Sequence, residues 1–110
     1  MNVYDVYITR QAEELLEETL YHITVNLLNP DAADAFVDVF YKEVNKLSKN
    51  PEKHRPIDEE PWGSEGIRKI TIKNYYVYFW IDVENAIVWV NAVVFAERDQ
   101  NKFLSSIDFK

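Results

Sequence analysis

The hydrophobic pattern of the chain changes its period once, and this change limits the folds open to it. Before residue 51, apolar residues recur at the three- and four-residue spacing of amphipathic helices. After residue 66, they alternate in β-branched and aromatic runs that are typical of strands. Residues 51–66 contain three of the four prolines and both glycines, so we expect a loop there. The order favours an α+β fold in which helices pack on one face of a sheet.

The first half is predicted to hold a short strand and a helix hairpin. Alternation over residues 3–8 predicts the strand, and Thr9 can cap the helix that follows. Asn29 and Pro30 separate two helices, because asparagine is a good N-cap and proline fits the first helical position. The second helix is expected to end just before Pro51. The predicted apolar stripes are Ala12, Leu15, Leu16, Leu20, Ile23 and Leu27 in the first helix, and Ala33, Phe36, Val37, Phe40, Val44 and Leu47 in the second.

The second half is predicted to form an antiparallel meander of three strands, Ile67 to Lys73, Tyr75 to Asp82 and Ile87 to Phe95, followed by a frayed helix or tail. Strand alternation directs one set of side chains toward the helices: Ile70, Ile72, Val77, Phe79 and Ile81. The opposite face then carries Lys69, Thr71, Lys73, Tyr76, Tyr78 and Trp80. Three aromatic residues on one face predict a surface that a partner covers, so we assign partner binding to Tyr76, Tyr78, Trp80 and Lys73.

Composition and charge exclude several classes of protein. A length of 110 residues predicts a single domain spanning residues 1–110, and the absence of cysteine excludes disulfides and thiolate metal sites. Two histidines and one acidic run give no metal-ligand pattern, so we expect neither a metal nor a cofactor. Without a signal sequence or an apolar run of about 18 residues, a cytoplasmic protein with no membrane contact is expected.

The formal net charge of −7 is unevenly distributed along the chain. Residues 1–41 contain one basic residue and eight acidic ones, whereas the remaining residues contain eleven of each. A basic site in the second part of the chain is therefore compatible with the acidic total.

Five segments carry a resemblance to a known family: YDVYITRQAEELLEE, NPDAADAFVD, LSKNPEKHRPI, GIRKITIKNYYVYFWID and VVFAERDQ. In this order and spacing, they resemble the RelE/ParE toxins over nearly the whole chain. The resemblance implies a RelE-like α+β toxin that is encoded beside an antitoxin, which wraps and neutralises it. It also implies two alternative targets. RelE-like members cleave messenger RNA on the ribosome, and ParE-like members block DNA gyrase.

The resemblance to RelE-like nucleases implies basic side chains around a scissile phosphate. Arg98 stands at the arginine that follows the last strand. Thr71 and Tyr76 occupy places where a basic residue and an arginine are expected, and Phe103 replaces a tail tyrosine and cannot donate a proton. The candidate catalytic residues are Arg98, with Arg68, Lys69 and His54 as substitutes.

These candidates also have structural interpretations. Arg68 is expected to pair with Glu65 or Asp58, and Arg98 with a neighbouring acid. His54 lies in the loop, where binding residues concentrate, and the adjacent Arg55 is expected to anchor that loop to the domain.

Three hypotheses follow from the residues and the resemblance. The leading one is a toxin that a cognate antitoxin neutralises, with gyrase or another target. The second is a ribosome-dependent endoribonuclease that uses Arg98. The third is a non-toxic member that only binds its antitoxin.

Overall fold

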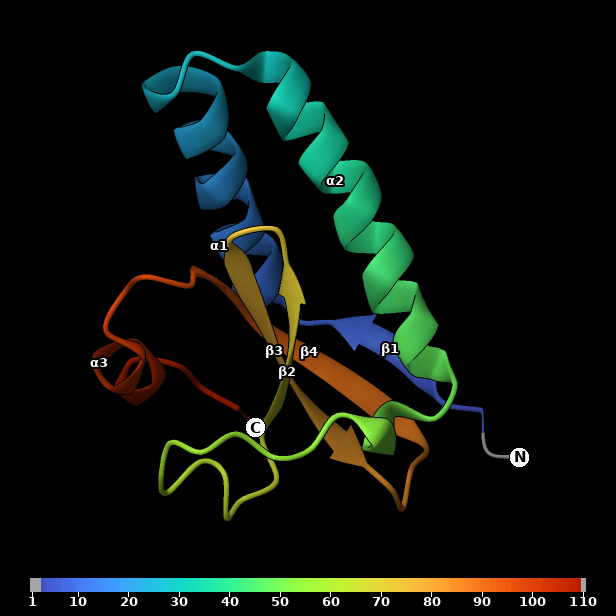
Figure 1. Cartoon of the computed structure of the whole chain (residues 1–110). Helices are drawn as coiled ribbons and strands as arrows, with labels where there is room; N and C mark the ends of the chain where they lie inside the picture. The colour runs from blue at the N-terminus through green and yellow to red at the C-terminus, as the bar shows by residue number, and fades with distance from the viewer. Residues whose placement is uncertain (1–2, 110) are drawn as a thin grey trace.

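A computed structural model describes residues 3–109 and confirms the predicted α+β class. Two helices form a hairpin that packs on one face of a four-stranded sheet, and a short third helix lies across the other face (Figure 1). The elements in chain order are β1 (Asp5–Ile8), α1 (Arg10–Tyr21), a π-helical turn (His22–Asn26), α2 (Pro30–Asn45), two 3₁₀ turns (Lys46–Ser48 and Pro51–Lys53), β2 (Arg68–Ile72), β3 (Tyr75–Asp82), β4 (Ile87–Phe95) and α3 (Gln100–Ser105).

The sheet has the strand order β1-β4-β3-β2. β2, β3 and β4 form the predicted antiparallel meander, and β1 joins β4 as a parallel edge strand. The predicted bounds of β3 and β4 are confirmed. β2 is one residue shorter than predicted at each end. At its C-terminal end, Lys73 lies in the turn to β3, where its backbone has a left-handed φ of 54°.

The predicted helix caps are confirmed. The Thr9 hydroxyl accepts a hydrogen bond from the backbone N–H of Ala12 at 3.1 Å, and the Asn29 side chain accepts one from Ala32 at 3.1 Å. α1 ends earlier than its apolar stripe, however, and continues as the π-helical turn. Leu27 therefore leaves the stripe and is 58% exposed, contrary to the prediction. No helix within residues 3–109 is long and apolar enough to cross a membrane.

The main core lies between the helix hairpin and the sheet. The strand residues that were predicted to face the helices do so. Fully buried aromatic and aliphatic side chains from both layers fill this space, and their burial supplies the largest favourable term in folding. The fully buried residues of the main core include Phe36, Phe40, Val44, Ile72, Val77, Phe79, Val88 and Val90.

The opposite face of the sheet holds a second core, which the sequence did not predict. Tyr78 is 0% exposed, and its ring stacks on that of Phe103 with a centroid distance of 6.3 Å. Its hydroxyl donates a hydrogen bond to Gln100 Oε1 at 2.7 Å. The expectation that Tyr78 is open to a partner is therefore wrong for the free chain, because α3 and the loop before β2 cover it. The second core comprises Ile57, Ile67, Tyr78, Ala92, Val94, Phe103, Leu104 and Phe109.

The Tyr78 hydroxyl is expected to contribute measurably to stability. Replacing it, as in Tyr78→Phe, should lower the free energy of unfolding by about 1 kcal/mol near neutral pH, because Gln100 loses a partner. Burial raises the pKa of Tyr78 above its ordinary value. The proton is thus lost more easily from the unfolded chain, so the advantage of the wild type should shrink as pH rises above about 10. Urea unfolding of both proteins across this range tests this; a constant difference would contradict it.

Candidate functional site

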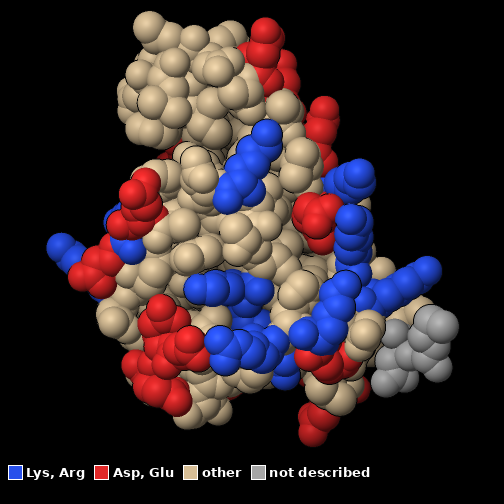
Figure 2. Space-filling view, viewed as in Figure 1, with Lys and Arg blue, Asp and Glu red and all other residues tan. Residues whose placement is uncertain are grey.

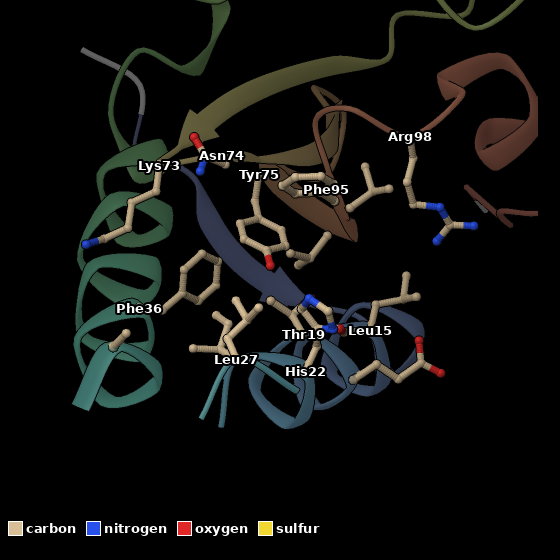
Figure 3. Close-up of a pocket in the computed structure, with 15 residues that line it drawn as sticks. Leu15, Thr19, His22, Leu27, Phe36, Lys73, Asn74, Tyr75, Phe95 and Arg98 are labelled. Atoms are coloured by element: carbon tan, nitrogen blue, oxygen red, sulfur yellow. The ribbon is translucent and has the colours of Figure 1, made fainter. Parts of the chain in front are cut away.

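A surface groove of about 630 Å³ lies between the helix hairpin and one end of the sheet. Its walls come from α1 and the π-helical turn, from α2, and from the β2–β3 turn together with the end of β4 (Figure 3). We call it the hairpin groove. It is lined by Leu15, Glu18, Thr19, His22, Ile23, Leu27, Ala32, Phe36, Lys73, Asn74, Tyr75, Val93, Val94, Phe95 and Arg98.

Aromatic rings form the sheet side of the hairpin groove. Tyr75 packs edge-on against Phe36 at a centroid distance of 5.0 Å and lies 5.5 Å from Phe95. Partial burial raises the pKa of Tyr75, so its phenol stays neutral near pH 7. Phe95 remains 36% exposed although it belongs to a strand. A concave site with mainly apolar walls is typical of a binding site for another molecule.

The groove opens toward an apolar tip at the junction of the two helices. The π-helical turn and the left-handed φ of 51° at Leu28 turn apolar side chains outward. Leu28 is 83% exposed, and Tyr21, Val25 and Leu27 are also exposed. Figure 2 shows this end of the molecule, at the top, as a lobe that is almost free of charged side chains. Contiguous exposed apolar surface of this kind marks sites of protein–protein contact.

The charged rim of the groove contains two of the predicted site residues. The backbone N–H of Ala96 donates to the carbonyl of Asn74 at 2.8 Å, which holds the segment after β4 against the turn that carries Lys73. The Arg98 guanidinium carbon lies 5.4 Å from the centroid of the Phe103 ring, and Arg98 forms no salt bridge with a carboxylate in residues 3–109. The predicted pairing of Arg98 with a neighbouring acid is therefore wrong.

Gln100 fixes the backbone around Arg98. Its side-chain amide donates to the carbonyls of Arg98 at 2.8 Å, Phe95 at 3.2 Å and Ala96 at 3.3 Å, while its oxygen accepts from Tyr78. The second core thus positions the arginine at the edge of the hairpin groove.

Arg68 serves the structure of the loop. Its Nη1 donates to the backbone carbonyls of Glu52 and His54, so it anchors the loop through the backbone and not through Glu65 or Asp58, as was expected. The nearby Arg55 pairs with Asp58 at 3.4 Å on the surface and does not anchor the loop to the domain. Arg68 accordingly helps to tie the loop to the sheet, together with the backbone hydrogen bond from Ile57 N–H to the carbonyl of Ile67 at 2.9 Å.

The remaining nuclease candidates lie apart from Arg98. Lys69 and His54 line a cavity at the edge of β2, and Arg98 does not. Contacts between side chains connect the two places: Lys69 Nζ lies 3.8 Å above the ring of Tyr76, Tyr76 packs on Tyr78, and Tyr78 stacks on Phe103 beneath Arg98. Aromatic rings therefore separate the bases, so the structure does not gather the predicted catalytic set at one point.

The predicted partner-binding residues are also divided. Lys73 lines the hairpin groove, whereas Tyr78 is buried and the half-buried Tyr76 and Trp80 pack against the second core. Strand alternation predicted an interaction on the sheet face, whereas the groove lies on the side of the helix hairpin. The pair Leu27 and Leu28 beside the helix break was the available signal, because two leucines next to a cap are unlikely to fit one buried stripe.

Comparison with solved structures supports the fold. The chain is similar to a chain of the chromosomal ParDE toxin–antitoxin system of P. aeruginosa, with 19% identity, a TM-score of 0.70, and coverage of 86% of this chain and 98% of that one. It is similar to a chain of the RelBE2 toxin–antitoxin complex of Mycobacterium tuberculosis, with 22% identity, a TM-score of 0.56, and coverage of 84% and 98%. A mutant of the E. coli toxin RelE in the free state gives 15% identity, a TM-score of 0.58, and coverage of 92% of both chains.

Sequence comparison is more specific than these structural similarities. No curated protein matches the chain. The sequence model of one protein family, the ParE toxin of the type II toxin–antitoxin system parDE, matches residues 6–100, which include most of β1 and every element from α1 through β4. The chain therefore belongs to the ParE toxin family of type II toxin–antitoxin systems.

Proposed function

We propose that this chain is a toxin that a cognate antitoxin neutralises by occupying the hairpin groove, and that its cellular target is DNA gyrase. The observation that carries the antitoxin proposal is the groove itself, about 630 Å³ in volume and continuous with exposed apolar side chains at Leu27 and Leu28. Two of the solved structures that the chain resembles are described as a toxin–antitoxin system and a toxin–antitoxin complex.

The shape of the groove favours an amphipathic helical segment as its occupant. Such a segment places apolar side chains every three to four residues along one face, and these side chains can replace solvent on the groove walls. The rim offers Glu18 on the helix side and Lys73 and Arg98 on the strand side. Charges of both signs at the rim of an apolar site favour one orientation of a bound segment over its reverse.

The choice of gyrase over messenger RNA depends on the side chains around Arg98. RNA cleavage requires several acid–base and phosphate-binding groups around one phosphate. Here the neighbouring positions hold Tyr76 beneath Lys69 and a buried Phe103 beneath Arg98. Phe103 has no hydroxyl, and Arg68 is engaged by the loop carbonyls. These contacts, together with the ParE family match, support a gyrase-directed toxin.

Expression of the chain in bacteria tests the toxin proposal. Induction alone should arrest growth, and co-expression of the short reading frame next to its gene should restore it. A folded chain that forms a tight complex with that partner but never arrests growth would instead identify a non-toxic, antitoxin-binding member. Because misfolding also abolishes toxicity, circular dichroism of the purified chain is the necessary control.

The target is tested with purified components and with cellular RNA. We expect the chain to inhibit supercoiling of relaxed plasmid DNA by gyrase, and we expect prior addition of the antitoxin to restore supercoiling. In the same cells, transcript ends should be unchanged after induction. Full gyrase activity together with new transcript ends that disappear in Arg98→Ala would overturn the gyrase proposal in favour of an endoribonuclease.

A further inference from the structure

A second cavity, of about 340 Å³, lies between the C-terminal end of α2, the turn at Pro51–Lys53 and the edge strand β2. We call it the basic pocket. Although the whole chain carries a net charge of −7, basic side chains gather over this side of the molecule (Figure 2). The pocket is lined by Glu43, Lys46, Leu47, Lys53, His54, Lys69, Ile70 and Thr71.

The one carboxylate of the basic pocket is already paired. Lys46 Nζ lies 2.8 Å from Glu43 Oε2. This hydrogen bond, together with the positive charges of Lys46, Lys42 and Lys53, lowers the pKa of Glu43. Neither Lys53 nor Lys69 forms a salt bridge with a carboxylate of residues 3–109. Two positive charges therefore remain available to an anion at the pocket.

The side chains around these charges are held in place. Lys69 lies 3.8 Å above the ring of Tyr76, and the imidazole of His54 packs edge-on against Phe79 at a centroid distance of 5.9 Å. Arg68 also binds the backbone carbonyl of His54. Groups that are ordered before binding lose less conformational entropy when a ligand arrives.

Burial and the charges of Lys53 and Arg68 lower the pKa of His54. The imidazole is therefore neutral near pH 7, where it still has one N–H to donate. Thr71, an exposed residue of β2, also lines this cavity, and its hydroxyl is a second neutral donor. Two amines, an imidazole N–H and a hydroxyl are a donor set suited to the several oxygens of a phosphate.

We propose that the basic pocket binds a phosphate group of a nucleic acid backbone. Further basic side chains favour a polymer over an isolated anion, because Lys42 and Lys49 are exposed on the segments that border the pocket. A nucleic acid presents phosphates at regular intervals, so one phosphate can occupy the pocket while its neighbours meet these flanking charges. Contacts of this kind give affinity without reading sequence.

The basic pocket is independent of the hairpin groove, since no residue lines both. An antitoxin segment confined to the groove would therefore leave the pocket open. The inference does not depend on the proposed target, and it extends to the toxin–antitoxin complex, to which the pocket would add a nucleic acid contact.

Fluorescence anisotropy with labelled duplex DNA and with single-stranded RNA of equal length tests the proposal. The pocket variant is Lys53→Gln with Lys69→Gln. The control, Arg10→Gln with Lys102→Gln, removes the same charge from exposed positions on α1 and α3. Only the pocket variant should make the plot of log association constant against log salt concentration less steep, by about 2. It should also weaken duplex binding roughly fiftyfold near 0.1 M salt.

A spectroscopic readout distinguishes a bound phosphate from general attraction. Bound nucleic acid should raise the pKa of His54, followed by NMR of its imidazole, because a nearby anion favours the protonated form. Whichever of the two polymers binds more tightly then identifies the source of the phosphate.

Three results would overturn the proposal. In the first, both variants lose affinity equally. In the second, inorganic phosphate alone perturbs His54 and neither polymer binds. In the third, poly-glutamate of matched charge binds the pocket as tightly as the nucleic acids, which would assign it to an acidic peptide.

Discussion

A double substitution in the hairpin groove, Leu27→Asp with Phe95→Asp, is expected to weaken antitoxin binding by about a thousandfold. Both side chains are partly exposed on the groove walls of the free chain, so charge introduced there is compatible with folding. A bound apolar segment would bury these charges without partners, which is strongly unfavourable. Central interface residues typically contribute about 2 kcal/mol or more each, and about 4 kcal/mol corresponds to this loss of affinity.

The matched control is Val83→Asp. Val83 is 68% exposed in the turn after β3, at the opposite end of that strand from the groove. It should leave the affinity within about twofold of the wild type, since a surface change far from an interface rarely exceeds about 0.5 kcal/mol. Isothermal titration calorimetry of the three proteins gives the comparison. Equal affinities for the wild type and the groove variant would remove the hairpin groove from the interface.

Removal of the Phe103 ring is expected to cause the largest loss of stability. Phe103→Ala should lower the free energy of unfolding by about 3–5 kcal/mol, because it leaves a cavity against Tyr78 in the second core. The neighbouring change Lys102→Ala, on the exposed side of α3, should have an effect of less than about 0.5 kcal/mol.

Urea unfolding gives the free energy of unfolding of both variants. The slope of this free energy against urea concentration reports whether each variant still unfolds in a single transition. Hydrogen exchange of the β3 amides should rise in Phe103→Ala if α3 protects this face. A loss below about 1 kcal/mol would mean that α3 contributes little to the closure of the second core.

The period of the hydrophobic residues was sufficient to predict most of the fold. Thr9 and Asn29 were correctly identified as helix caps because capping depends on the local sequence. The bounds of β3 and β4 followed from alternation and turn residues. The parallel pairing of β1 with β4 is long-range in sequence, and no local pattern specifies which strand a distant segment joins.

The candidate site was predicted less well, for two physical reasons. Alternation correctly placed Tyr78 on the side away from the helices, but it cannot say that residues 103 and 104 cover that side. Helical spacing placed Leu27 in the buried stripe, whereas the π-helical turn changes the spacing and exposes it. The groove arises where three segments meet, so it was visible only once the tertiary arrangement was known.

The role of Arg98 illustrates the same limit. The resemblance singled out Arg98 as a candidate catalytic residue, and the structure places it on the rim of the hairpin groove, where its environment determines its chemistry. Lys69 and His54, offered as its catalytic substitutes, belong to a different cavity. The rings of Tyr76, Tyr78 and Phe103 lie between these two residues and Arg98. Residue spacing in the sequence does not show that these rings are in contact.

Growth after induction of the wild type and the groove variant, each with and without the antitoxin, tests the central claim most directly. We predict arrest by either protein alone, growth when the antitoxin accompanies the wild type, and arrest when it accompanies Leu27→Asp with Phe95→Asp. Equal rescue of both proteins, or normal growth with the folded wild type alone, would contradict an antitoxin-controlled toxin that is neutralised through the hairpin groove.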